Sequence, residues 1–291
     1  MPASLFSFPA GITNNARRAA HKSVRKYWHV IGIGIQNNLT YRFNYLTRTL
    51  FSFIPLFAML SLWRTVYASK PAGSSLSGFT QPEMIFYYLM VAVVDVLTAV
   101  NEDDWQIAAD IREGNISQFL LKPIDYLWYR LCLFFAGRMA FITMASIPLA
   151  LFILCFRKNV MPPPDAGAFA AFVLSMGLAA MLQFFISYAM AMLAFWFLEI
   201  STLIFILFAF EYLASGHLFP LSMLPAALRH VLFFTPFPYQ LYFPAAVYMG
   251  KISGTQLEMG LLAQAAWVFA AFVLARFAWS RGIKKYAAFG G

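Results

Sequence analysis

The stretch NEDDWQIAADIREGNISQFLLKP, which runs from Asn101 to Pro123, gathers acidic side chains in a chain that is otherwise strongly apolar. Of the 291 residues, 61% are hydrophobic and only 11% are charged. Apolar runs flank the stretch on both sides. It therefore forms either a solvated loop or a surface that another molecule contacts. It holds five of the 12 acidic residues of the protein, namely Glu102, Asp103, Asp104, Asp110 and Glu113.

The composition of the whole chain indicates an integral membrane protein. A hydrophobic share of 61% is well above the usual level in soluble domains. The net charge of +9 raises the question of a nucleic-acid partner. However, the basic residues lie beside the apolar runs, as membrane-flanking charges do, and form no separate basic domain. We therefore expect membrane lipid around the chain and no nucleic acid bound to it.

Six stretches are long and apolar enough to cross a bilayer. A spanning helix needs about 20 mostly apolar residues, because its backbone polar groups must find partners within the segment. The apolar run 166–220 is long enough for two helices, which we expect to meet in a turn at Glu199, Ser201 and Thr202. The predicted fold class is thus an all-α polytopic protein with six transmembrane helices. The other four stretches are residues 46–67, 83–100, 131–156 and 257–279.

The distribution of basic residues predicts the orientation. Cytoplasmic flanks of membrane helices carry the excess of lysine and arginine. With six spans, 15 of the 21 basic residues fall on the side that holds both termini and residues 101–123. Both termini and the acidic stretch are therefore expected to face the cytoplasm.

Two further segments are expected to meet the membrane without crossing it. Residues 23–45 combine basic with apolar and aromatic side chains, which suits a helix at the inner interface, although a frayed cytoplasmic lead is the alternative. Residues 216–250 are apolar but carry five prolines, a density that no uninterrupted helix tolerates. We predict short re-entrant or interfacial helices there, on the outer side. Residues 1–22 are expected to be a flexible extension of a single permease domain that covers 23–291.

The sequence contains no convincing catalytic pattern. The closest approach to a phosphate-binding loop is YMGKIS, residues 248–253, which lacks the first glycine and has Ile252 where serine or threonine is required. The four histidines show no spacing typical of metal ligands, and no Gly-x-Ser-x-Gly pattern occurs. We predict no enzyme activity, no cofactor and no metal site within this chain.

Two charged residues fall inside predicted spans, where charges are costly and are functional candidates. Asp95 and Arg138 lie at similar depth, roughly 8 to 10 Å from the same side at ~1.5 Å per residue. We predict that they form a structural ion pair. A proton relay is less favoured because one pair is not a chain of carriers. Glu211 lies deeper and has no partner that the sequence reveals.

The acidic stretch has the periodicity of an amphipathic helix over residues 103–113. Asn101 is a candidate N-cap, and Gly114 followed by Asn115 predicts the end of the helix. A second short apolar turn, ISQFLLK, ends at Pro123. Because the cytoplasmic leaflet is itself negative, an anionic face favours a protein partner over lipid. The apolar arc holds Trp105, Ile107, Ala108 and Ile111, and the polar arc holds Gln106, Asp110 and Glu113.

Residues 110–123, DIREGNISQFLLKP, resemble the pattern Ile-Arg-x-Gly-x-(Ile/Leu)-x-x-x-Leu-Leu-(Lys/Arg)-Pro. This pattern is found in permeases of the type-2 ATP-binding-cassette (ABC) exporter family, in a little-characterised branch of six-span subunits. The resemblance extends over about residues 23–285. It includes FPLSMLP, residues 219–225, and TPFPYQ, residues 235–240.

The resemblance implies a permease subunit of an ATP-driven exporter in the bacterial cytoplasmic membrane. Its partners would be cytoplasmic ABC ATPase subunits and a second permease subunit, identical or homologous. The loop 101–123 would be a coupling helix that docks on the ATPase. The alternative, an ion- or proton-coupled secondary transporter, would need linked charges at mid-membrane and repeated halves. The positions that match the pattern are Ile111, Arg112, Gly114, Ile116, Leu120, Leu121, Lys122 and Pro123.

Within the loop, the resemblance and the helical faces together suggest three kinds of role. Apolar side chains would seat the helix, polar side chains would contact the ATPase, and two residues would fix the shape of the loop. The first group is Trp105, Ile107 and Ile111, the second is Asp110, Arg112 and Glu113, and the third is Gly114 and Pro123.

Overall fold

The computed structural model describes residues 25–38, 40, 42–71, 73–99 and 103–286, and the regular elements in these ranges are helices. Five of them are long and apolar enough to cross a membrane. The chain is an all-α polytopic membrane protein, as its composition predicts. The five helices are α2 (Arg42–Ala68), α3 (Gln81–Thr98), α6 (Tyr126–Cys155), α7 (Ala166–Ala191, extended by the 3₁₀ helix η2, Met192–Phe195) and α11 (Gly254–Gly282).

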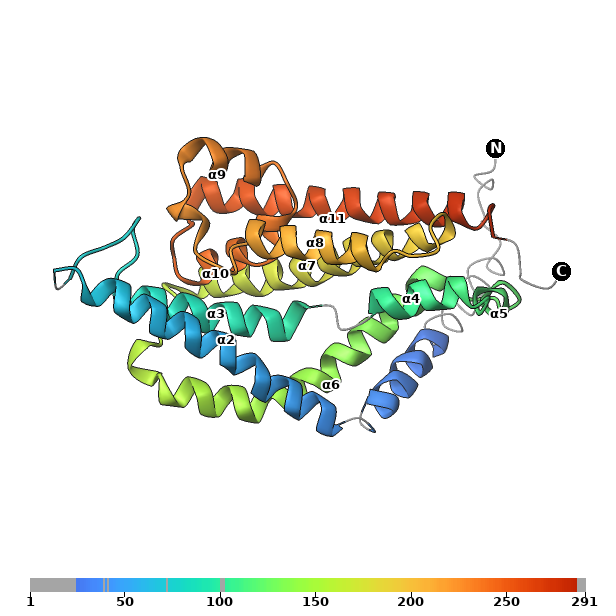
Figure 1. Ribbon diagram of the computed structural model, residues 1–291, viewed down its shortest axis with the longest axis horizontal. Coiled ribbons are helices and arrows are strands. Elements are labelled where there is room, and N and C mark those ends of the chain that lie inside the picture. Colours follow the sequence, from blue (N-terminus) through green and yellow to red (C-terminus); the bar gives the residue numbers. More distant parts are fainter. Residues whose placement is uncertain (1–24, 39, 41, 72, 100–102, 287–291) are drawn as a thin grey trace, which may run out of the picture.

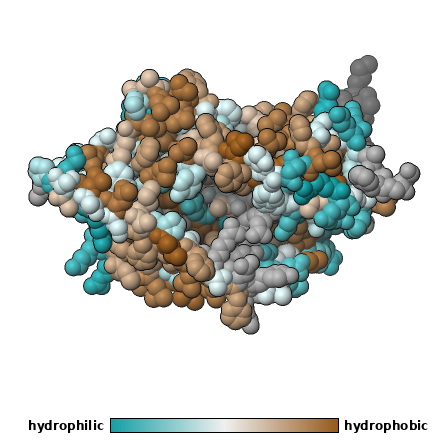
Figure 2. Space-filling model, in the orientation of Figure 1, coloured by the Kyte–Doolittle hydropathy of each residue, from teal (hydrophilic) through white to brown (hydrophobic). Residues whose placement is uncertain are grey.

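The long helices run side by side along the longest axis of the molecule, and short elements close both ends (Figure 1). We call the end that carries α4 (Asp103–Arg112) and α5 (Ile116–Leu120) the α4 end, and the opposite end, with α9 (Ala226–Phe233), the α9 end. Apolar surface dominates the middle of the molecule, whereas hydrophilic residues gather towards the two ends (Figure 2). This distribution matches the apolar band and polar rims of a bilayer.

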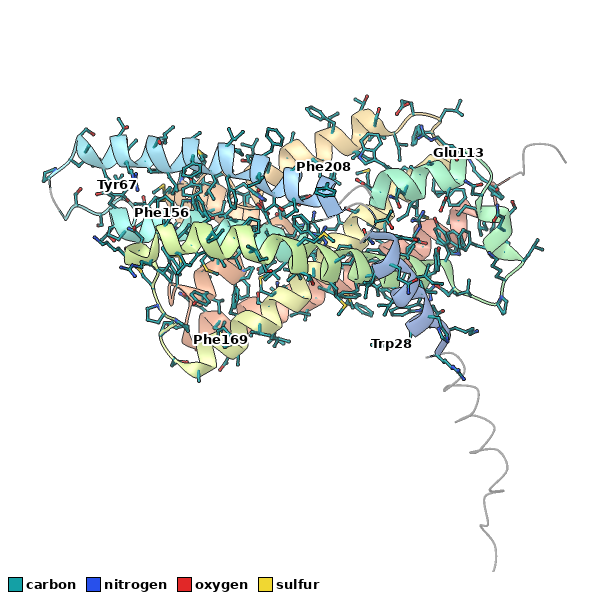
Figure 3. The ribbon with its side chains drawn as sticks, turned by 90° about the horizontal axis from the view of Figure 1, so that it is seen from below. Trp28, Tyr67, Glu113, Phe156, Phe169 and Phe208 are labelled. Atoms are coloured by element: carbon teal, nitrogen blue, oxygen red, sulfur yellow. The ribbon has the colours of Figure 1, made fainter. Side chains whose placement is uncertain are left out.

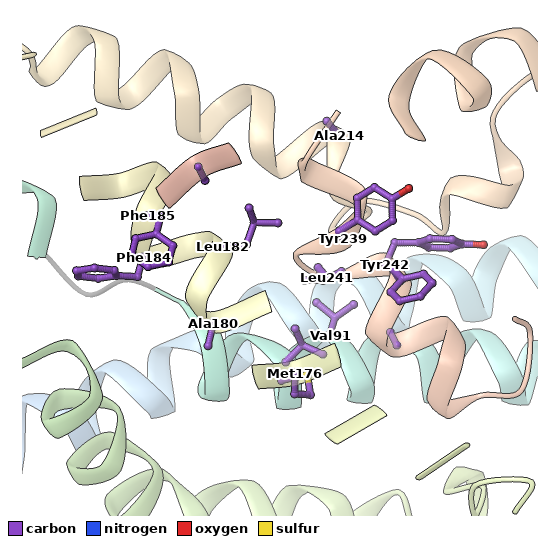
Figure 4. Packing of buried hydrophobic residues seen from close by; sticks show 14 of the residues in the cluster. Val91, Met176, Ala180, Leu182, Phe184, Phe185, Ala214, Tyr239, Leu241 and Tyr242 are labelled. Atoms are coloured by element: carbon purple, nitrogen blue, oxygen red, sulfur yellow. The ribbon is translucent and has the colours of Figure 1, made fainter. Parts of the chain in front are cut away.

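Helix α7 lies at the centre of the packing. It contacts α11, α3 and α4, as well as the short helix α10 (Tyr242–Tyr248). Half of the residues in the most apolar stretch of α7 are buried within the chain, compared with 17% in α2 and 22% in α11. Small residues such as Ala179 and Ala180 let neighbouring helices approach, which is how helices associate in lipid. Figure 4 shows Met176 and Ala180 of α7 close to Val91 of α3 and Leu241.

Side-chain caps fix the starts of three long helices. Thr80 and Glu83 form a capping box at α3, with the backbone N–H of Thr80 donating to Glu83 at 2.8 Å. Asp125 accepts from the Trp128 N–H at the start of α6 at 3.2 Å. Asp165 accepts from the N–H of Ala168 in α7 at 2.7 Å. These bonds satisfy donors that a helix N-terminus leaves without partners.

The fifth predicted span is shorter than expected. The structure places a turn after η2, where Glu199 and Ser201 predict one, but the helix that follows, α8 (Ser201–Ala214), has only 14 residues. At ~1.5 Å per residue it is roughly 21 Å long, which is less than the thickness of a bilayer core. The helix stops because Gly216 adopts a φ of +100° and Pro220 follows. The prediction of six full-length helices is therefore wrong for this one.

Residues 216–250 form short helices, as their prolines predict. Pro220 and Pro225 occupy the N-cap positions of the first two. Helix α10 is buried and packs against α7 and α3, whereas α9 is largely exposed. The outer, re-entrant placement of this segment stays a prediction. The helices are η3 (Leu221–Met223), α9, η4 (Phe237–Tyr239) and α10.

A further helix, residues 25–38, precedes α2 and lies near the α4 end (Figure 1). A Cβ atom on Gly34 would lie 2.7 Å from the Cβ of Ala136, so the helix packs closely on α6. The Lys26 Nζ donates to the Pro123 carbonyl at 3.0 Å. Trp28 is 70% exposed, as an interfacial helix requires. The predicted flexible extension, residues 1–22, lies outside the described residues.

The contact between α10 and α11 generates a stability prediction. A Cβ atom on Gly260 would lie 2.1 Å from the buried ring of Phe243. Gly260→Ala should therefore lower the thermal unfolding midpoint of the detergent-purified protein, with a cost of about 1–3 kcal/mol from overpacking. The matched control is Gly177→Ala, whose new Cβ meets nothing within 4 Å. Equal midpoints for the two variants would contradict this close packing.

Candidate functional site

Helix α4 is seated on the bundle by its apolar arc. Ile107 and Ile111 are 1% and 5% exposed, and Ala108 is fully buried. The neighbours of this face are α7 and η2. Trp105, in contrast, is 39% exposed and lies at the edge of the contact. The predicted seating role thus fits Ile107 and Ile111 better than Trp105, and the apolar face of α4 is covered by the chain itself.

Asp110 is held inside the chain. It forms an ion pair with Arg130 of α6 and accepts a hydrogen bond from the Tyr126 hydroxyl at 2.8 Å. The Arg130 Nε donates to the same hydroxyl at 2.9 Å, which closes the network. Arg130 is only 5% exposed. The start of α6, directly after the loop, thus brings Arg130 to this carboxylate, and the contact between Asp110 and an ATPase stays a prediction.

Arg112 points across to the turn between η2 and α8. Its Nη1 donates to the Leu198 carbonyl at 3.3 Å and lies 3.8 Å from Glu199. Hydrogen bonds from the side chain and backbone of Ser201 lower the pKa of the Glu199 carboxyl, which keeps it charged opposite Arg112. The pair is exposed, so it adds little stability, but it connects α4 to a second part of the bundle.

Gly114 ends α4 and receives hydrogen bonds from two other segments. Its φ is +82°, a left-handed conformation that favours glycine, so the predicted stop is confirmed. Its carbonyl accepts from the Ser117 hydroxyl at 2.6 Å and from the Tyr286 hydroxyl at 2.7 Å. Tyr286 follows the end of α11, so its hydrogen bond to Gly114 joins the loop to the last helix.

The junction between the loop and α6 is also bound to α11. Asp125 forms an ion pair with Arg276 at 2.5 Å. One helical turn further on, the ring of Trp279 stacks on Tyr126 with 5.2 Å between centroids. The segment from α4 to the start of α6 is therefore fastened to α6, α7 and α11 together. Sequence patterns did not indicate Arg276 or Tyr286, because these residues lie 151 and 172 positions from their partners.

The outward surface of the loop consists of exposed side chains, and the Pro123 carbonyl accepts the hydrogen bond from Lys26. Leu120 and Leu121 are 51% and 89% exposed, and Lys122 and Pro123 are exposed beside them. Glu113, labelled at the α4 end in Figure 3, is exposed and accepts a hydrogen bond from its neighbour Asn115 at 3.2 Å. We call Glu113 and residues 120–123 the loop surface. The candidate N-cap Asn101 lies outside the described residues.

Inside the bundle, the structure gives Asp95 a different partner from the one predicted. The Asp95 Oδ1 lies 2.9 Å from Nε2 of His217. Arg138 instead donates to the Val96 carbonyl at 3.4 Å and lies over the Phe141 ring. The predicted Asp95–Arg138 pair is therefore not formed. Similar depth on two helices does not fix the direction in which each side chain points, and His217 lies 122 residues away in sequence.

His217 is held in place from three sides. Nδ1 lies 2.7 Å from the Ser215 hydroxyl, Nε2 contacts Asp95, and the Tyr212 ring stacks on the imidazole with 4.6 Å between centroids. The order serine, histidine, aspartate resembles a hydrolytic triad. However, Ser215 is fully buried, so no substrate carbonyl can reach its hydroxyl. The arrangement orients His217 and Asp95 and does not form a nucleophile.

One comparison with known proteins gave a match. The model of a family described as "ABC-2 family transporter protein" matches residues 53–290, which is most of the chain and includes all of the loop and the Asp95–His217 pair. No curated protein and no solved structure matched the chain.

The Asp110–Arg130 network generates a prediction about the attachment of α4. Arg130→Met removes one member of a largely buried pair, which typically costs about 3–5 kcal/mol in local stability. We expect faster amide hydrogen exchange across residues 103–112 in the detergent-purified protein. Arg281→Met, which alters an exposed arginine of α11, is the matched control. Unchanged exchange in α4 of the Arg130 variant would show that the network does not hold this helix.

Proposed function

The chain belongs to the ABC-2 family of transporter proteins, and we propose that it is the permease subunit of an ATP-driven exporter. A separate cytoplasmic ATPase subunit would dock on the loop 101–123. Both termini would then face the cytoplasm, in agreement with the 15 of 21 basic residues on that side. The direction of transport and the location in the bacterial cytoplasmic membrane rest on the resemblance of residues 110–123.

The observation that carries this proposal is the division of the loop into two faces. The inner face is fastened to α6 through Asp110, and to α11 and the residues that follow it through Asp125 and Gly114. The outer face offers two adjacent exposed leucines, Leu120 and Leu121, at the α4 end of the molecule. Exposed apolar side chains rimmed by polar ones are typical of protein contact sites. A loop that is fastened to the bundle on one face and exposes apolar side chains on the other can transmit the movement of a bound partner to the bundle.

The loop surface has none of the excess positive charge that attracts a protein to the anionic cytoplasmic leaflet. Its exposed charged side chains are one carboxylate, Glu113, and one amine, Lys122. Leu121, at 89% exposure, is the most exposed of the large apolar side chains in the described part of the chain. An apolar side chain that a partner buries contributes to binding through area removed from water.

The contacts also suggest how the partner would act on the permease. Movement of the loop surface would reach α6 through Asp110 and Arg130, and the α7–α8 turn through Arg112. It would reach the end of α11 through the bond from Tyr286 to Gly114. A change of access requires the ATPase to favour one arrangement of these helices over another.

A second permease subunit, identical or homologous, completes the proposed assembly. Helix α2 buries only 17% of its most apolar window within this chain, and α8 exposes Phe205 and Ile206 by 72% and 58%. Lipid covers such surfaces adequately, so these exposures permit a partner but do not require one. The pairing rests on the family resemblance.

The alternative, a proton-coupled secondary transporter, gains support from one observation. Asp95 and His217 are in contact in the bundle, and Glu211 lines the same cavity. These groups are titratable, as carriers of protons must be. Transport in proteoliposomes distinguishes the two functions: an exporter needs the ATPase and ATP, whereas a proton-coupled carrier works with a pH gradient alone.

The loop surface leads to a direct test of ATPase docking. Leu121→Asp places a charge in the apolar tip without touching the inner face. Co-expressed ATPase subunit should then bind the permease about tenfold more weakly or worse, since burying an unpaired carboxylate is costly. Val160→Asp is the matched control, because Val160 is an exposed apolar residue in the turn beyond α6 at the opposite end. Equal recovery of ATPase with both variants would argue against docking at this surface.

A further inference from the structure

Two cavities meet around Asp95 and His217, between α3 and α8. The smaller has a volume of about 180 Å³ and is lined largely by polar side chains from α7, α8 and the segment before α10. The larger, about 360 Å³, lies between α2, α3 and α6 and is mainly apolar. Asp95, Ala99, Tyr212 and His217 line both cavities. The two cavities therefore adjoin at these residues, and we call the smaller the polar compartment and the larger the apolar compartment.

The polar compartment contains buried polar atoms that the protein does not satisfy. Glu211 is 8% exposed, and its Oε1 accepts from Gln183 Nε2 at 2.7 Å, but its Oε2 has no partner among the described residues. Gln240 is 3% exposed, and neither its Oε1 nor its Nε2 has a partner among them. Leaving such groups without a partner costs about 1–3 kcal/mol each. Both side chains line the smaller cavity, so a polar molecule there would satisfy them.

The charged side chains that line the two cavities determine which kind of polar group a ligand would need. Asp95 and Glu211 are carboxylates, and among the described residues neither lysine nor arginine lines either cavity. Asp95 uses one oxygen for His217 while 42% of its side chain remains exposed. An anionic head group would meet two carboxylates, and the histidine that lines both cavities, His217, is already in contact with Asp95. A protonated amine would instead form charge-assisted hydrogen bonds.

The apolar compartment determines the chemistry of the rest of the ligand. Leu56, Met59, Val91 and Phe141 line it together with other apolar side chains from α2, α3 and α6. Its volume falls within the range of small-molecule sites. Asp95 and His217 are the carboxylate and imidazole side chains among the residues that line it. A molecule that fills both compartments therefore has an apolar body and a polar end.

We propose that the two cavities form a binding site for an amphipathic organic cation. Its protonated amine lies among Asp95, Glu211 and Gln240, and its apolar body lies between α2, α3 and α6. This inference rests on the proposed transport function, because it identifies the chemical class of the cargo. The sequence alone did not bring these groups together, since they come from separate helices and from the irregular segment that follows α8.

The test uses three fluorescent probes with the same naphthalene body. Each has a five-carbon arm that ends in a primary amine (dansylcadaverine), a hydroxyl or a carboxylate. Binding to the full chain in lipid nanodiscs is measured at pH 7 by fluorescence titration, with empty nanodiscs as the lipid background. We expect the amine to bind about tenfold more tightly than the hydroxyl, and the carboxylate to bind most weakly, because only the amine pairs with the carboxylates.

Variants show whether this preference belongs to the proposed site. Glu211→Gln and Asp95→Asn should each weaken amine binding about tenfold while leaving hydroxyl binding unchanged. Unchanged hydroxyl binding also shows that the variant is folded. Glu211→Asp should keep the preference, since it keeps the charge. Glu258→Gln, which alters an exposed carboxylate of α11, is the matched control and should bind like the natural sequence.

Equal binding of the three probes by the natural sequence would overturn the proposal, whatever the variants do. An amine preference that survives both Glu211→Gln and Asp95→Asn would also overturn it. Docking of the ATPase is scored separately on the same preparations. If the ATPase binds but the amine is not preferred, the cargo proposal alone fails. If the amine binds but no ATPase docks, the proposed function fails and the binding site stands.

Discussion

An ion pair between Asp110 and Arg130, completed by the Tyr126 hydroxyl, fastens the loop between α3 and α6 to the membrane bundle. Arg130 is 5% exposed, and separating a largely buried arginine from its carboxylate is costly. This cost keeps α4 and α6 together. The other ties, from Gly114 to Tyr286 and from Asp125 to α11, add to the constraint. The exposed tip of the loop therefore has a fixed position relative to the long helices, which is the property that a docking element requires.

The shortness of α8 has the complementary effect inside the bundle. Because the helix ends at Ala214, the chain leaves it within the bundle and brings His217 against Asp95 of α3. Irregular backbone at membrane depth persists only where protein or a cavity satisfies its polar groups. Here the Tyr242 N–H donates to the Ser215 carbonyl at 3.0 Å, and the Tyr87 hydroxyl donates to the Gly216 carbonyl at 2.6 Å. These bonds position the polar wall of the cavities.

Sequence patterns predicted the features that depend on local periodicity and turn chemistry. Ile107 and Ile111 fall on the buried face of α4, and Gly114 ends the helix, because these outcomes depend on a few neighbouring residues. The partners of Asp110 and Asp95 were beyond such reasoning. They depend on the rotation of each helix about its axis and on the path of the chain after α8. The sequence predicts how deep Asp95 lies within its span, but this depth does not determine which neighbouring side chain Asp95 faces.

The central claim is that the loop and the bundle move as one body when the partner ATPase binds ATP. Spin labels at Gln118 of α5 and Ser280 of α11, both exposed, test it in a complex whose native Cys132 and Cys155 are replaced by serine. Distances are measured by pulsed electron resonance with and without a non-hydrolysable ATP analogue. The account predicts an unchanged distance from Gln118 to Ser280, while the distance from Gln118 to a label on the second permease subunit changes. A change in the first distance on nucleotide binding, with the second constant, would contradict it.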